Sequence, residues 1–430
     1  MAITKSIKPI SAVLAFLLMF VMTAQPALAA DRFSSRSAVP AQYKWDLTRI
    51  YETMGDWESD ALLLEATLIP RINSYRDRLD RRENVLTCFK ALTEAHIVLE
   101  KLLAYAAFGH YVDMSIPGAQ ALYGRVAILG QKLGEAASYI GPQLAIMGTA
   151  VLTEYLGDPD FREYTNLISG ILNRLPNILS EEEEALLAMQ TIFAQSPLGI
   201  YSMLYNVDMY SVYNAVISIV SPDNRAAAEA AGIRLNLLRN LNNTFAAILA
   251  AEVNKNIFWA RARNFNSTLE ASLSPDIPVI VYENLISATN RGLASKHRYN
   301  NLVMEMANTQ EFKGLYPYIS YEEARKTILS ALKALGADYV NMLETVFNEN
   351  WIDVYPTPNK MGGAFSASLY SVHPFVLMNY YGTIYCAATL AHELGHAIHK
   401  YYSSATQPFN AAGVPIFTAE VAALVNEIIL

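Results

Sequence analysis

The sequence predicts a mainly α-helical protein with one small β element in its C-terminal part. Most of the chain after residue 30 carries apolar residues at the spacing of amphipathic helices, in windows rich in Ala, Leu and Glu. One later stretch instead has the aromatic and β-branched composition of short strands. The clearest helical windows are 58–68, 84–107 and 226–258.

The length and composition are those of a folded globular protein. At about 150 residues per domain, 430 residues suggest two or three domains. Apolar residues make up 53% and charged residues 17%, which excludes a disordered chain. The net charge is -8 and no Lys/Arg-rich block occurs, so we expect no nucleic-acid partner.

The first 29 residues have the pattern of a secretory signal peptide. Lys5 and Lys8 precede an apolar run, 10–22, and Ala27-Leu28-Ala29 supplies small residues for cleavage. The run falls short of the roughly 20 residues that span a bilayer. We therefore expect an exported protein, periplasmic or extracellular, that starts near Ala30 and has no stable membrane span after cleavage. The alternative is an uncleaved anchor.

Capping and breaking residues mark helix ends. Ser180, with Glu183 three residues later, has the pattern of a capping box at the start of a helix. The acidic run 181–184 suits a helix N-terminus, and an acidic binding patch is the weaker interpretation. Breakers at 221–223 and 273–278 separate further helices.

The two cysteines, Cys88 and Cys386, leave two alternatives open. One disulfide is possible in an oxidising compartment, but two cysteines in a chain of this length do not make a disulfide scaffold. We prefer two buried free thiols.

The β element follows Trp351. A Pro- and Gly-containing loop over 356–363 leads into 364–378, which mixes aromatic and β-branched residues. That stretch can hold two short strands, one of them over 375–378. The helical pattern returns around Tyr385.

The motif H-E-x-x-H occurs at 392–396 in this returning helix. Residues four apart on an α-helix lie about 40° apart around the axis and ~6 Å along it. His392 and His396 can therefore reach one zinc ion at ~2.0–2.1 Å. Glu393 can take a proton from a metal-bound water, so the motif predicts a zinc-dependent peptidase with one Zn²⁺ per chain.

Glu420 lies in a second helical run and is the candidate third ligand. A carboxylate from a neighbouring helix would complete a His, His, Glu site. The rival pattern H-E-x-x-H-x-x-G-x-x-H fails, because His399 stands at its glycine and Tyr402 at its third histidine. We expect His399 to support the site or to lie on the surface. Ordinary helix histidines and a solvated Glu420 remain the structural alternative.

Several segments resemble the oligoendopeptidase F branch of the thimet-oligopeptidase family of zinc metallopeptidases. The segments that carry the resemblance are 361–366, 373–383 and 389–396, with 43–47, 260–265 and 351–354 in support. The resemblance runs over most of the mature length. It implies a helical ellipsoid with a deep channel, closed to folded proteins, in which short peptides are cleaved at internal bonds.

The resemblance also implies roles for individual residues. It makes His392, His396 and Glu420 the zinc ligands. It makes Glu393 the general base and proton shuttle of the reaction. On this basis we divide the chain into the signal peptide, an N-terminal helical domain over 30–205 and a zinc metallopeptidase domain over 206–430.

A strand beside the zincin-type helix is expected to bind substrate. The resemblance places Phe375, Val376 and Leu377 next to the site, as an edge strand that pairs with the peptide backbone. A plain core strand is the alternative.

The sequence departs from the family pattern at three points. The export signal is unusual, Ala423 stands where a small hydroxyl residue is common, and family members continue with a long helical stretch after the position of Leu430. That stretch supplies donors to the substrate carbonyl and the oxyanion. The apolar run 421–430 has no Gly or Pro stop, so we expect a catalytic domain that is incomplete at its C-terminus.

Three functions follow, in order of preference. The first is a zinc-dependent endopeptidase that cleaves internal bonds of short peptides by attack of a Glu393-activated, zinc-bound water. The second is a zinc- and peptide-binding remnant with little or no turnover. The third is a helical scaffold whose histidines are structural.

Overall fold

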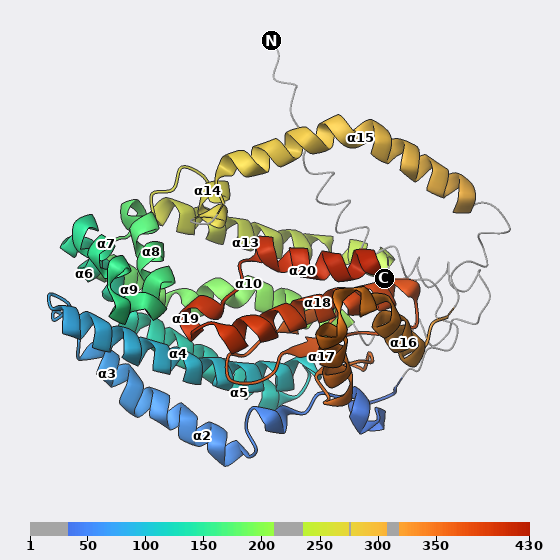
Figure 1. The fold of residues 1–430 in the computed structure, drawn as a ribbon, viewed down its shortest axis with the longest axis horizontal. Coiled ribbons are helices and arrows are strands. Elements are labelled where there is room, and N and C mark those ends of the chain that lie inside the picture. The colour runs from blue at the N-terminus through green and yellow to red at the C-terminus, as the bar shows by residue number, and fades with distance from the viewer. Residues whose placement is uncertain (1–32, 210–234, 275–276, 308–317) are drawn as a thin grey trace, which may run out of the picture.

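The computed structural model describes residues 33–209, 235–274, 277–307 and 318–430, and the expected signal peptide lies outside them. The mainly helical prediction is confirmed: helices form nearly all regular structure, with one small sheet near the C-terminal helices (Figure 1). The predicted deep channel and the domain boundary at 205/206 stay predictions.

The N-terminal helices pack around a first core of apolar side chains. Trp57, Phe89 and Phe161 are among its fully buried members. These helices are α2 (Met54–Leu63), α3 (Ile69–Asn73), α4 (Arg82–Tyr111), α5 (Pro117–Ala137), α6 (Ile140–Met147), α7 (Thr149–Gly157) and α8 (Thr165–Arg174), and α9 (Glu181–Met189) packs on α5. Burial of this many large apolar side chains makes the first core the larger source of hydrophobic stabilisation.

The predicted capping box at Ser180 is confirmed. The Ser180 hydroxyl accepts from the backbone N–H of Glu183, and the Glu183 carboxylate accepts from the N–H of Ser180, at the start of α9. Thr53 and Ser320 begin α2 and α16 (Tyr321–Ala331) in the same way. Reciprocal bonds of this kind satisfy backbone donors that a helix start leaves free.

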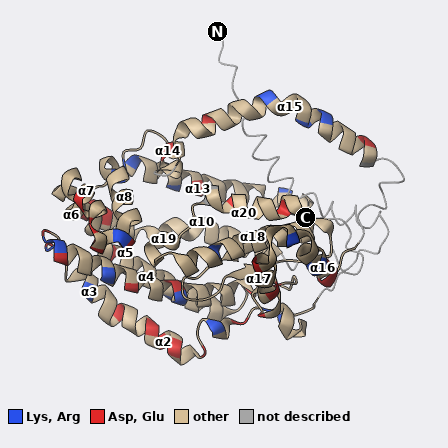
Figure 2. Ribbon diagram, in the orientation of Figure 1, with Lys and Arg blue, Asp and Glu red and all other residues tan. Residues whose placement is uncertain are grey.

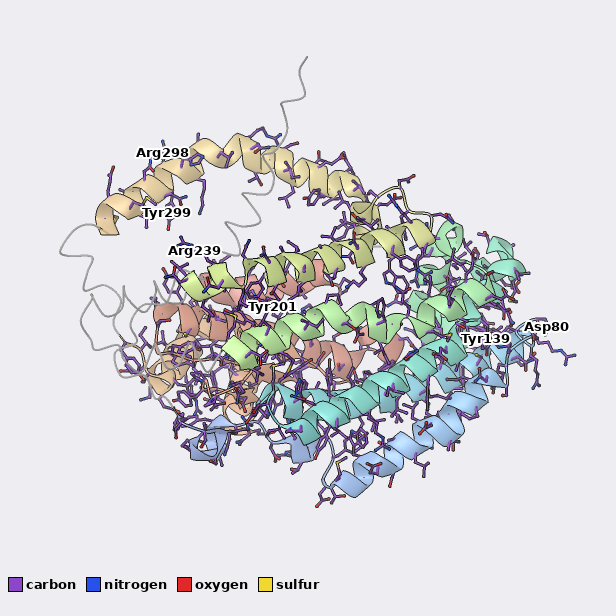
Figure 3. The ribbon with its side chains drawn as sticks, turned by 180° about the vertical axis from the view of Figure 1, so that it is seen from behind. Asp80, Tyr139, Tyr201, Arg239, Arg298 and Tyr299 are labelled. Atoms are coloured by element: carbon purple, nitrogen blue, oxygen red, sulfur yellow. The ribbon has the colours of Figure 1, made fainter. Side chains whose placement is uncertain are left out.

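The middle of the described chain is helical as well. It contains α10 (Thr191–Met203), α13 (Asn242–Ala262), α14 (Thr268–Leu273) and α15 (Val279–Ala307). α10 packs on α13, whereas α15 stands apart and has no buried side chain. Figure 3 shows Arg298 and Tyr299 on α15, far from Tyr201 on α10.

The sheet has three strands in the order β1-β3-β2. β1 (Ile352–Asp353) pairs parallel with β3 (Phe375–Leu377), and β2 (Phe365–Ala367) pairs antiparallel on the other side. The prediction of two short strands within 364–378 is confirmed.

β3 joins two cores, because successive side chains of a strand point to opposite faces. Phe375 and Leu377 belong to the first core. Val376 belongs to a second core, which also contains Leu343 and Leu394. The helices around the second core are α16, α17 (Ala337–Asn348) and α18 (Ile384–Thr406), followed by α19 (Phe409–Ala412) and α20 (Ile416–Ile429).

A buried ion pair fixes the loop between β1 and β2. The ammonium of Lys360 lies 2.7 Å from Asp353 Oδ1, and both side chains are almost fully buried. Lys360 also donates to the backbone carbonyls of Tyr355 and Met378, and Arg36 contacts the other carboxylate oxygen at 2.6 Å. Burial lowers the pKa of Lys360, and Asp353 opposes that shift.

The first described residues pack against the C-terminal part of the chain. The backbone N–H of Val354 donates to the carbonyl of Tyr43 at 3.0 Å. The side-chain amide of Asn350 donates to the carbonyls of Ala41 and Lys44 at 2.7 and 2.9 Å. The segment 33–45 therefore belongs spatially to the second core as well as the first.

Both cysteines are free thiols in this structure. Cys88 is buried in α4, next to the hydroxyl of Tyr139 (labelled in Figure 3), and burial raises its pKa to about 11. Cys386 is half-buried in the first turn of α18 and accepts from the Thr383 hydroxyl.

Among the described helices, none combines the length and the apolar character needed to cross a membrane.

Candidate metal centre

The H-E-x-x-H motif lies in the middle of α18, as predicted. One stripe of this helix, with Leu390, Leu394 and Ile398 at four-residue spacing, is buried in the second core. The packing of that stripe fixes the rotation of the helix. His392 and His396 consequently lie on a neighbouring face, where their side chains are 22% and 12% exposed.

Gly395 allows α20 to approach α18 very closely. A Cβ atom at this position would lie 2.7 Å from the carbonyl oxygen of Ala422 and 2.7 Å from the Cα of Ala423. Any larger residue would force the two backbones apart. The glycine inside the motif therefore sets how near α20, with Glu420, comes to the histidines.

Asn426 locks the register between these two helices. Its side chain is fully buried, and its amide donates to the backbone carbonyl of Ala391 at 3.0 Å. Its Oδ1 accepts from the hydroxyl of Tyr339, on α17, at 2.8 Å. Because both halves of the amide are satisfied, α20 is held in one position along α18.

The three residues predicted to bind metal come together in the structure. Nε2 of His392 lies 3.5 Å from Glu420 Oε2, and Nε2 of His396 lies 3.6 Å from Glu420 Oε1. One donor atom from each residue lies within 4.8 Å of the other two. Both imidazoles thus direct the same type of nitrogen toward one carboxylate.

This donor set fits a zinc ion. Two imidazole nitrogens and one carboxylate oxygen form a typical catalytic zinc set with a free fourth position. Two atoms bound tetrahedrally to one zinc ion at ~2.0–2.1 Å lie roughly 3.3–3.4 Å apart. Each histidine has one carboxylate oxygen of Glu420 close to that distance, Oε2 at 3.5 Å from His392 and Oε1 at 3.6 Å from His396.

Glu393 lies beside this cluster and is 7% exposed. Burial raises its pKa to about 7, while His392 and Lys400 favour the charged form and Glu420 opposes it. The backbone N–H of Ser366 donates to its carboxylate. Glu393 is thus a carboxylate with a fixed orientation that can hold or release a proton near neutral pH.

Lys400 connects α18 to the sheet, a contact that the sequence analysis missed. Its ammonium donates to the carbonyl of Ser366 on β2 at 2.8 Å. Burial lowers the pKa of Lys400, and the carboxylates of Glu393 and Glu420 oppose that shift. The position of Lys400, four residues after His396 on the same helix face, was the available sequence signal.

The prediction that Phe375, Val376 and Leu377 form an edge strand is wrong. They form β3, the central strand, whose backbone pairs with β1 on one side and β2 on the other. All three side chains are fully buried. A strand that is paired on both sides cannot accept a peptide as an added strand. β2 is the edge strand nearer to α18.

Two further residues, His399 and Glu427, lie on the same two helices as the three candidate ligands. His399 is half-buried and is not part of the cluster, in line with its expected exclusion from the ligand set. Glu427, also missed from the sequence, places its Oε2 3.1 Å from Nδ1 of His392. It lies seven residues after Glu420, two helical turns along the same face of α20.

A mainly helical chain in which an H-E-x-x-H helix packs against a later helix that carries a glutamate has the architecture of a helical metallopeptidase. Comparison with known families agrees. Residues 335–430 match Peptidase family M3, and residues 144–210 match the N-terminal Oligopeptidase F family of the same group. Two segments of the chain thus match family models of the M3 group, and the resemblance to the oligoendopeptidase F branch is confirmed.

Individual relatives extend the similarity along the chain. Oligopeptidase PepF of Bacillus subtilis is 29% identical, over 93% of this chain and 64% of its own length. Group B oligopeptidase PepB of Streptococcus agalactiae is 28% identical, over 92% of this chain and 70% of its own. The chain thus spans 64% of the length of the first relative and 70% of the second.

Solved structures share the fold. A structure from Chlamydophila abortus superposes with a TM-score of 0.66 at 25% identity, covering 93% of this chain and 71% of that protein. Oligoendopeptidase-F from Enterococcus faecium superposes with a TM-score of 0.60 at 23% identity, covering 87% of this chain and 66% of that protein. The second likeness concerns the fold alone.

Proposed function

We propose that this chain acts as a zinc-dependent endopeptidase that cleaves internal bonds of short peptides. The observation that carries the proposal is the convergence of His392, His396 and Glu420 from two helices, with Glu393 directly beside them. The names of the relatives, oligopeptidases and oligoendopeptidases, support a peptide substrate of limited length.

The two histidines would hold one Zn²⁺ through their Nε2 atoms, and Glu420 through its carboxylate. When bound, the ion supplies a Lewis acid that lowers the pKa of water and polarises a carbonyl group. The remaining chemistry belongs to side chains of this protein.

Glu393 is the proposed general base and proton shuttle. Its position one residue after His392 on α18 places its carboxylate at the edge of the cluster. The Ser366 N–H fixes its direction, and its pKa of about 7 suits both uptake of a proton from water and delivery to the leaving amine. Lys400, at the other side of Ser366, holds β2 against the helix that carries the base.

The test is hydrolysis of a quenched fluorescent short peptide by the chain with added zinc. We expect cleavage that a chelator stops. Glu393→Gln should reduce kcat by ~10²–10⁴-fold while zinc remains bound. Glu344→Gln, at an exposed glutamate on α17, serves as the matched control and should leave the rate unchanged.

Each outcome separates the candidate functions. Full activity in Glu393→Gln would refute the assigned base. A folded, zinc-loaded chain that retains peptide without cleaving it would support the zinc- and peptide-binding remnant. A folded chain that binds no zinc would leave only the scaffold interpretation.

We also propose that the protein is exported. The proposal rests on Lys5, Lys8 and the apolar run 10–22, followed by Ala27-Leu28-Ala29. N-terminal sequencing of the protein from its natural source should give a chain that starts near Ala30. A protein that still starts at Met1 in the cytoplasm would contradict the proposal.

A further inference from the structure

α20 touches the first histidine of the motif on the side away from the metal cluster. The Oε2 atom of Glu427 lies 3.1 Å from Nδ1 of His392. The other ring nitrogen, Nε2, lies 3.5 Å from Glu420. The imidazole of His392 is therefore held between two carboxylates of the same helix, one at each nitrogen.

We propose that Glu427 is a positioning residue that keeps the proton of neutral His392 on Nδ1 and its Nε2 lone pair toward the metal. A neutral imidazole has one N–H and one acceptor nitrogen, and a carboxylate can only accept. Glu427 therefore favours the tautomer with hydrogen on Nδ1, the one that can bind a metal through Nε2. The inference rests on the proposed metal-binding function.

The placement of Glu427 follows from the packing of α20. Its neighbour Asn426 is bonded to the carbonyl of Ala391, which directly precedes His392. Two consecutive residues of α20 thus hold two consecutive residues of α18. The buried amide fixes the register between the helices, and the half-exposed carboxylate uses that register to reach the ring.

The second histidine has no such support in the described residues. Nδ1 of His396 is buried and has no hydrogen-bond partner among them. The two ligands of one motif are therefore oriented by different means. His396 is confined by burial, whereas His392 is more exposed and is oriented by Glu427. Loss of Glu427 should affect His392 selectively.

The first measurement is zinc affinity, by competition with a chromophoric chelator. Glu427→Ala should raise the zinc Kd by about 10–100-fold, the usual effect of losing such a partner. Glu427→Gln should lose less, because its amide oxygen can still accept the Nδ1 hydrogen bond. Glu344→Ala is the matched control and should bind zinc like the parent chain.

The second measurement needs no metal. ¹⁵N NMR of histidine-labelled, metal-free chain at pH ~8, above the pKa of a histidine in a model peptide, reports which ring nitrogen carries hydrogen, and His392→Asn assigns the signal. We expect the Nδ1–H tautomer in the parent chain and a shift toward Nε2–H in Glu427→Ala. Far-UV circular dichroism checks folding, and Glu427→Gln replaces the alanine variant if that one unfolds.

The outcomes are distinguishable from those of the proposed function. An unchanged Kd and an unchanged tautomer in folded Glu427→Ala would overturn the positioning role. If the parent chain binds no zinc, the proposed function fails. In that case the tautomer of metal-free His392 still decides the role of Glu427.

Discussion

The two cores of this protein differ in where their ion pairs lie, at the surface or in the interior. Charged residues occur along the helices of the first core (Figure 2), and one of their ion pairs, Arg125–Glu58, has side chains that are 45% and 47% exposed. Around the second core, the Lys360–Asp353 pair is almost completely buried. Among the charged residues that the structure describes, the buried ones are Asp353, Lys360 and Glu393, all near the sheet and α18.

This difference indicates that the buried charges serve to fix local geometry and not to stabilise the fold. Exposed pairs contribute little, because water screens them and their side chains lose freedom. Buried charges cost desolvation energy, so they are poor stabilisers compared with apolar side chains of the same size. Here the buried charges lie near the sheet and α18, the helix that carries two of the candidate metal ligands. Lys360 fixes the loop before β2, and Glu393 accepts a hydrogen bond from the backbone of β2. We infer that the second core gives up some stability for a defined site.

Lys360→Met should have the largest effect of the substitutions that test this difference between the cores. Asp353 would stay buried with only the partly exposed Arg36 as its ion-pair partner, so we expect the free energy of unfolding to fall by about 3–5 kcal/mol. Lys132→Met, which removes an exposed pair with Glu65, is the control and should not shift the urea midpoint measurably. Equal effects of the two variants would show that the cores do not differ in this way.

The free energy of unfolding of the metal-free protein should depend on pH through the buried carboxylate of Glu393. Burial raises the pKa of Glu393 from 4.5 to about 7, so the folded state binds a proton more tightly than the unfolded state. Stability from this group is present below pH 4.5 and is lost as the pH rises to about 7. At 1.36 kcal/mol per pKa unit, the loss is on the order of 3 kcal/mol.

Urea unfolding at several pH values measures that loss, with Glu393→Gln as the comparison. The glutamine does not titrate, so the stability difference between parent and variant should change between pH 4.5 and 7 and stay constant above pH 7. A difference that is independent of pH would contradict the assigned protonation of Glu393.

A smaller effect is expected from Gly395→Ala. The new methyl group would meet the backbone of α20 at 2.7 Å, so overpacking should cost about 1–3 kcal/mol and weaken zinc binding by displacing Glu420. Gly199→Ala, within α10 and in open space, is the control and should be neutral or stabilising. Zinc affinity and thermal unfolding measure both, and unchanged affinity in Gly395→Ala would show that α20 does not need this contact.

Local geometry explains which parts of the site could be predicted. His392, Glu393 and His396 are fixed relative to one another by one helix, so their spacing was sufficient. Glu420 needed the family spacing as well, because its distance from the histidines depends on how two helices pack. The strand around Phe375 was found from its composition.

Non-local packing explains what the sequence did not reveal. Whether β3 is central or at an edge depends on β1, which pairs with it from more than twenty residues upstream. The buried role of Lys360 depends on the same sheet. Glu427 was recognisable only as a residue two turns from Glu420, and its contact with His392 requires the register set by Asn426.

The packing of the first described residues has a consequence for the order in which the protein can fold during synthesis. The Asn350 side chain bonds to the carbonyl of Ala41 across 309 residues. At a synthesis rate of roughly 5–20 residues per second, those two residues leave the ribosome roughly 15–60 s apart. The segment around Ala41 is therefore synthesised long before its partner Asn350, and it cannot reach its final packing until that part of the chain has been made.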